Sequence, residues 1–132
     1  MSMFSGFHTS ASGLTAQRLR LDTVSSNIAN AQTTRGELVE GKWQPYARKL
    51  AVLKETASGV TVSEIRKDSE PFKLEYNPNH PDADELGYVK MPNVDLLKEM
   101  VDMMGATRSY EANVTALNAT KAMLVKAMEI GK

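Results

Sequence analysis

Apolar side chains recur at intervals of seven residues at both ends of the chain. Residues 2–31 and residues 93–130 both show this spacing, which is typical of coiled-coil helices. The repeating positions are Phe7, Leu14, Leu21 and Ile28 in the first segment and Leu96, Met103, Tyr110, Leu117 and Leu124 in the last. At a rise of about 1.5 Å per residue, the pattern predicts helices of roughly 45 Å and 57 Å. We expect the repeating positions to serve as assembly contacts.

Helix-ending signals bound the two predicted helices. Residues 33–36, with two threonines and a glycine, interrupt the first pattern. Asn93 is the expected N-cap of the last helix, and Asp95 suits the positive end of its dipole. Gly131 is the expected C-terminal stop.

The middle of the chain has a different character. Residues 46–53 and 59–67 are rich in strand-forming side chains, and residues 72–76 alternate between apolar and charged side chains. Turn signals follow at residues 58–59 and 77–78. We therefore predict a small antiparallel β element of three or four short strands. The fold class is mainly α, divided into residues 1–36, 37–92 and 93–132, with the long terminal helices in coiled-coil-like packing around the β insertion.

Charge narrows the function classes. Lys plus Arg and Asp plus Glu number 16 each, so no overall field attracts nucleic acid or an anionic membrane. Cysteine is absent, which excludes disulfides and cysteine nucleophiles, and no apolar run is long enough to span a bilayer. Between residues 103 and 120 the only charges are Arg108 and Glu111. A helix without a charged outer face normally has neighbours on several sides, so we expect a self-assembling structural subunit and not an enzyme.

A few polar residues are candidates for specific contacts. The side chains of Asn27, Asn30 and Asn113 either bridge neighbouring subunits by hydrogen bonds or serve as capped or solvated positions. Arg108 either pairs with an acidic group of a neighbour or is solvated. Residues 80–85 hold one histidine and three carboxylates, but their spacing is unlike a calcium loop and favours a solvated turn. No catalytic, cofactor or metal site is expected.

Three motifs resemble a known family. Residues 26–31, SNIANA, followed by Thr34 and Gly36, resemble the N-terminal signature of bacterial flagellar rod and hook proteins. Residues 102–113, DMMGATRSYEAN, resemble their C-terminal signature, and residues 87–94, GYVKMPNV, resemble the lead-in found in one proximal-rod branch. Together the motifs and the segments that contain them cover about half of the chain. Residues 37–45, which include Trp43, depart from many relatives, in which a shorter connection follows the first signature.

The resemblance implies a role and a place. Such proteins leave the cell unfolded through the flagellar type III export apparatus, without a cleaved signal. Their terminal helices build the wall of a hollow drive shaft outside the cytoplasmic membrane, in the periplasm where an outer membrane is present. The implied partners are further copies, the other proximal-rod proteins, the distal rod and the adaptor between rod and export gate. No cofactor, nucleic acid or membrane insertion is implied.

A prefoldin-like holdase chaperone is the alternative, because it also combines β hairpins with coiled-coil helices. The uncharged backs of the predicted helices disfavour it, since the arms of such a chaperone project into water.

Overall fold

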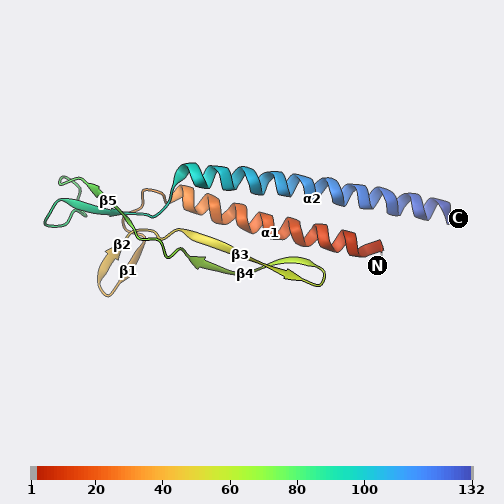
Figure 1. Ribbon diagram of the computed structural model, residues 1–132, viewed down its shortest axis with the longest axis horizontal. Coiled ribbons are helices and arrows are strands. Elements are labelled where there is room, and N and C mark those ends of the chain that lie inside the picture. The colour runs from red at the N-terminus through yellow and green to blue at the C-terminus, as the bar shows by residue number, and fades with distance from the viewer. Residues whose placement is uncertain (1–2, 132) are drawn as a thin grey trace.

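Two long antiparallel helices and three β hairpins make up the chain (Figure 1). The computed structural model describes residues 3–131. The helices are α1 (Met3–Ala29) and α2 (Leu96–Ile130). The strands are β1 (Glu37–Val39), β2 (Lys42–Gln44), β3 (Lys49–Thr56), β4 (Gly59–Lys67), β5 (Lys73–Tyr76) and β6 (Tyr88–Met91). The predicted mainly helical fold with a small β element is confirmed.

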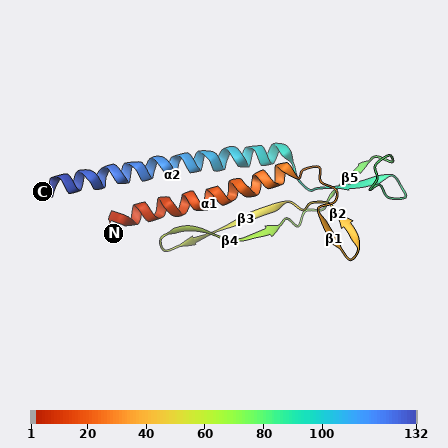
Figure 2. The ribbon, with the colours of Figure 1, turned by 180° about the vertical axis from the view of Figure 1, so that it is seen from behind.

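The long elements form three layers. In both views α1 lies between α2 and the β3–β4 hairpin, and α1 contacts both of them (Figures 1 and 2). The β1–β2 and β5–β6 hairpins lie at the opposite end of the molecule from the two chain termini. Because α1 is covered on two sides, it holds most of the buried helix residues, among them Ala16 and Val24. Within the described residues, neither helix is long and apolar enough to cross a membrane.

Small and polar residues form the closest contacts between the helices. These contacts are spaced by seven and then fourteen residues, and they pair Gly6 with Thr120, Gly13 with Asn113 and Asn27 with Glu99. A β-carbon on Gly13 would lie 2.9 Å from the Asn113 amide, so the helices approach closely there. The observed period matches the predicted one, but on α1 these contacts fall one residue before the predicted apolar positions, which are half-buried. The apolar side chains therefore flank the closest contacts, where larger groups would hold the helices apart.

The tip of the β3–β4 hairpin is fastened to the first half of α1. Thr9 Oγ1 donates to the Ser58 carbonyl at 3.3 Å, and the Val60 N–H donates to Ser12 Oγ at 3.1 Å. Gly59 has a φ of +138°, and a β-carbon there would lie 2.1 Å from Ser12 Oγ. Only glycine combines that backbone conformation with so close an approach.

The strands of the middle segment differ from the prediction, and the strand predicted at residues 46–53 is β3 at Lys49–Thr56. The β element is three separate two-stranded hairpins instead of one group of three or four strands. The β1–β2 hairpin was missed because all six of its strand residues are exposed, so no alternating pattern marks it. Its turn is built by Glu40 and Gly41, which both have positive φ, as a tight hairpin requires. The β4 bounds, residues 59–67, agree with the prediction.

The last helix begins later than predicted. Asp95, not Asn93, is its N-cap, with the Leu97 N–H donating to Asp95 Oδ1 at 3.0 Å. Asn93 is buried and hydrogen-bonded to other segments, so its side chain does not cap the helix. Gly131 closes the helix as expected, and its N–H donates to the Ala127 carbonyl.

Gly59→Ala should destabilise the fold by roughly 2–4 kcal/mol, because it adds backbone strain and a clash with α1. Gly41→Ala is the matched control, since Gly41 also has positive φ but a β-carbon there meets nothing within 4 Å. That control should cost only about 1 kcal/mol. Urea unfolding measures both free energies, and equal losses would show that the hairpin tip does not depend on its fit against α1.

Candidate functional site

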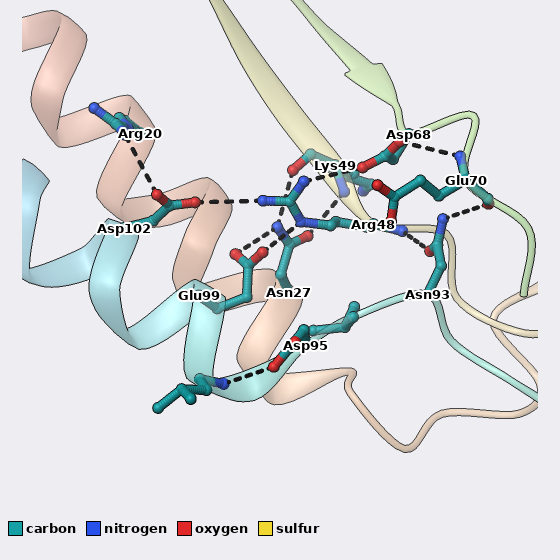
Figure 3. A network of polar contacts seen from close by, with 12 residues as sticks. Arg20, Asn27, Arg48, Lys49, Asp68, Glu70, Asn93, Asp95, Glu99 and Asp102 are labelled. Atoms are coloured by element: carbon teal, nitrogen blue, oxygen red, sulfur yellow. Dashed lines mark hydrogen bonds and ion pairs between the residues drawn. The ribbon is translucent and has the colours of Figure 1, made fainter. Parts of the chain in front are cut away.

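A buried ion-pair network lies where the helices meet the hairpins (Figure 3). At its centre the Arg48 guanidinium contacts three carboxylates. Nε donates to Glu99 Oε1, Nη1 donates to Asp68 Oδ2 at 2.9 Å, and Nη2 donates to Asp102 Oδ2 at 3.3 Å. Glu99 is fully buried and Arg48 is 6% exposed. A planar guanidinium with five donors suits such multiple contacts, whereas a lysine ammonium does not.

Asn27 joins α1 to this network. Its Nδ2 donates to Glu99 Oε2 at 3.0 Å and to the Lys49 carbonyl at 2.9 Å. Its Oδ1 accepts from the Lys49 N–H at 2.9 Å and from the Tyr46 hydroxyl at 3.0 Å. Two donors and two acceptor positions are the full hydrogen-bonding capacity of an asparagine side chain. The burial of Asn27 is therefore completely compensated.

Asn93 fastens the lead-in of α2 to the start of β3 and to the segment after β4. Its Oδ1 accepts from the Arg48 N–H at 2.7 Å, and its Nδ2 donates to the Glu70 carbonyl at 2.9 Å. The network thus connects five parts of the chain: α1, the start of β3, the segment after β4, the lead-in to α2, and α2 itself (Figure 3).

The charges in this network stabilise one another. Burial opposes the charge of Arg48, but hydrogen bonds and ion pairs with Glu99 and Asp68 outweigh it, so the pKa of Arg48 is raised. The Glu70 N–H and Arg48 lower the pKa of Asp68. Arg20 approaches Asp102 at 3.7 Å from α1. Because every strong donor and acceptor at the centre has a partner within the chain, the arrangement is suited to holding segments together and not to binding a substrate.

Residues 80–85, for which the sequence favours a solvated turn over a metal loop, include a carboxylate that is hydrogen-bonded to the segment after α1. Arg35 and Thr34 both donate to Asp82, and these bonds lower the pKa of that carboxyl. His80 Nδ1 accepts from the Asp82 N–H. Among residues 3–131 no group of three potential ligands is placed to hold a metal ion.

The three asparagines of the predicted site all make hydrogen bonds within the chain. Asn27 is the central one described above. Asn30 donates to the Ser26 carbonyl at the end of α1, and Asn113 donates to the Ser109 carbonyl while facing Gly13. Bridges from these residues to neighbouring subunits stay predictions.

The remaining predicted site residues lie along the helices. Arg108 is exposed and makes no ion pair in the part of the chain that the structure describes. Leu96 is 43% exposed. The half-buried ones are Phe7, Leu14, Leu21, Ile28, Met103, Tyr110, Leu117 and Leu124. Their incomplete burial leaves apolar surface along both helices for further contacts, and those contacts also stay predictions.

A second feature is an apolar face of α2 that nothing in the described chain covers. Leu97, Met100, Val101 and Met104 are each more than half exposed. With Arg108 and neighbouring residues they line an open groove of about 580 Å³. The far end of α2 projects beyond the start of α1 and exposes Met123, Val125, Met128 and Ile130 (Figure 1). Exposed apolar surface on this scale marks an interaction site.

Neither the network nor this face was predicted from the sequence. Arg48 and Asp68 lie in a highly charged segment that looks like solvated surface, and no local pattern points to their burial. Glu99 did carry a signal, because it shares the seven-residue spacing of Ala106 and Asn113 on α2. The exposed face could have been found as a second apolar stripe at residues 97, 101 and 104.

Arg48→Met should destabilise the protein by roughly 3–5 kcal/mol, because it leaves the buried Glu99 carboxylate without its cation. Arg48→Lys should recover only a part, since one ammonium cannot contact three carboxylates in the same plane. Lys126→Met, which breaks the exposed pair with Glu129, is the control and should change stability by at most about 0.5 kcal/mol. Urea unfolding measures all three variants, and an effect of Arg48→Met as small as that of the control would contradict a stabilising network.

Comparison with known proteins places the chain in a family. The flagella basal body rod protein family matches residues 7–35, and the C-terminal family of flagellar basal body rod FlgEFG proteins matches residues 85–130. These matches contain the three motifs that carry the resemblance.

Relatives that match over their full length belong to the same family. The chain is 51% identical, over an alignment of 150 residues that includes gaps, to the flagellar basal-body rod protein FlgC of Bacillus subtilis (strain 168), with 100% of each chain covered. It is 43% identical over 138 residues to FlgC of Escherichia coli O157:H7, again covering 100% of each. It is 40% identical over 153 residues to FlgC of Borreliella burgdorferi, covering 98% of each. The chain therefore belongs to the flagellar basal-body rod protein family and, within it, to the FlgC proteins.

Proposed function

We propose that this rod protein is a subunit of the proximal rod and that its two terminal helices build the wall of a hollow shaft. The shaft transmits motor torque and lets exported subunits pass through its lumen. The observation that carries this proposal is the apolar face of α2, together with its projecting end, which the chain leaves uncovered. In aqueous solution, such a face is removed from contact with water only if neighbouring molecules cover it.

The lack of charge along α2 supports the same conclusion. Apart from Arg108 and Glu111, residues 103–120 are uncharged, and many of them are exposed in the single chain. A helix that faced water for its whole length would carry charges on its outer face. Small residues such as Ala112 and Ala116 instead allow other helices to approach closely. A prefoldin-like chaperone, the alternative from sequence, finds no support in the family to which the chain belongs.

The proposed partners are further copies, the other proximal-rod proteins, the distal rod and the adaptor that joins the rod to the export gate. The export apparatus is a transient partner, and the assembled protein lies in the basal body outside the cytoplasmic membrane. The absence of cysteine suits this route, because no disulfide has to be broken before an unfolded chain passes through a narrow channel. Its stability rests on non-covalent contacts that form again after export.

Ala116→Glu should impair rod assembly while leaving the single chain folded. Ala116 is exposed, so the change should alter the free energy of unfolding by at most about 0.5 kcal/mol. In an assembled wall the same carboxylate would be buried among helices without a partner, at a cost of several kcal/mol per subunit.

Asn79→Glu is the matched control, because Asn79 is an exposed residue in the turn between β5 and β6, far from the helices. Swimming motility and the recovery of intact rods are the measurements, alongside urea unfolding of both purified variants. Normal rods from the Ala116→Glu strain would argue that this face of α2 is solvated, and the crowded wall would have to be abandoned.

A further inference from the structure

The β1–β2 hairpin presents an apolar face to solvent. Its register places Leu38 directly opposite Trp43, so the two side chains lie on the same face of the ribbon. They are 56% and 54% exposed, and Trp43 borders an open pocket that Tyr88 and Lys90 of β6 also line. The stability of so short a hairpin does not require an exposed tryptophan in one of its strands. Tryptophan is, in contrast, among the residues that contribute most to binding energy at protein interfaces.

The groove on α2 offers a matching surface. It extends from Leu97 to Arg108, which is roughly 16 Å along the helix axis at 1.5 Å per residue. Each strand of the hairpin has three residues and is therefore about 10 Å long, so it fits within the length of the groove. Two of the groove residues, Met100 and Met104, are methionines, whose thioethers make favourable contacts with aromatic rings. Length and chemistry both fit an apolar hairpin face that lies along the groove.

One chain cannot bring these two surfaces together. In both views the β1–β2 hairpin lies beyond the ends of α1 and α2 that are opposite the chain termini, and on the β3–β4 side of the molecule (Figures 1 and 2). A second copy can supply the hairpin without any change in its fold. Since the two surfaces lie on opposite sides, such a contact leaves one groove and one hairpin free, and it propagates from copy to copy.

We propose that the Leu38–Trp43 face of the β1–β2 hairpin of one copy docks into the α2 groove of a second copy. The proposal rests on the proposed function, since it names one contact by which rod subunits assemble. Charge favours the β1–β2 hairpin as the element that fills the groove. Arg108 borders the groove, and Glu40 lies exposed at the turn of the hairpin. The projecting end of α2 is also apolar, but residues 121–131 carry Lys121 and Lys126 against one carboxylate, Glu129, so Arg108 disfavours this segment on balance.

Cysteine cross-linking tests the contact directly, because the chain has no cysteine of its own. Two populations of the full chain, one with Glu40→Cys and one with Arg108→Cys, are mixed, assembled and treated with a short thiol cross-linker. The mixture should give a cross-linked dimer, and each population alone should give none above background. A third population, with Lys126→Cys, replaces Glu40→Cys in a parallel mixture to test the projecting end of α2 as the occupant.

The outcomes separate this contact from the proposed function. A dimer only in the Lys126→Cys mixture overturns the proposal and assigns the groove to the end of α2. Assembled material without either dimer also overturns it, while the role in the rod stands. Failure of the unmodified chain to associate with itself or with other rod proteins overturns both.

The single tryptophan provides an independent readout in the unmodified chain. Trp43 emission should move to shorter wavelength on assembly, because the indole leaves water. Arg108→Glu should weaken this shift, and Glu40→Arg in the same chain should restore it. Emission typical of an exposed indole throughout the assembled protein would overturn the proposal.

Discussion

The fold depends on the ion pair between Glu99 and Arg48, which is buried away from water. A fully buried carboxylate is tolerated only if a cation and hydrogen-bond donors replace the water that it loses. Here the guanidinium of Arg48 and the amide of Asn27 supply them. Each of these groups comes from a different element, so the position of α1, the start of β3 and the start of α2 are set by one another. The same guanidinium also contacts Asp68, which brings in the segment that follows β4.

This anchoring at one end shapes the rest of the molecule. From the network outward, α1 and α2 run side by side with small residues such as Gly13 between them, and the β3–β4 hairpin covers the other side of α1. The arrangement leaves α2 covered on one side only. A rod subunit needs this combination, because it must keep a defined shape at one end while it offers long helix surfaces to its neighbours. The buried ion-pair network and the exposed apolar groove thus lie on opposite faces of the first turns of α2.

Local patterns predicted the elements whose residues follow a period. Both helices and the span of β4 could be placed from the spacing of apolar residues and from turn signals, because those signals are contained within each segment. Interactions between distant segments could not be predicted from such local patterns. Arg48 and Glu99 are 51 residues apart, and although the seven-residue spacing of Glu99 indicates a buried position, nothing local predicts its pairing with Arg48. Asn93 was expected to cap α2, but its partners Arg48 and Glu70 also come from elsewhere in the chain. The β1–β2 hairpin escaped prediction for another reason, since an exposed ribbon has no buried face to impose alternation.

Amide hydrogen exchange on the dilute monomer tests most directly whether the network holds the two helices together before assembly. If it does, the slowest amides will lie near the network, in residues 20–29 of α1 and 96–106 of α2, where opening requires the buried charges to separate. Protection will fall along α2 toward residues 123–131, which have no cover from α1. Fast exchange through both helices, with slow amides confined to the β3–β4 hairpin, would contradict the account. It would show that the helices become ordered only in the rod.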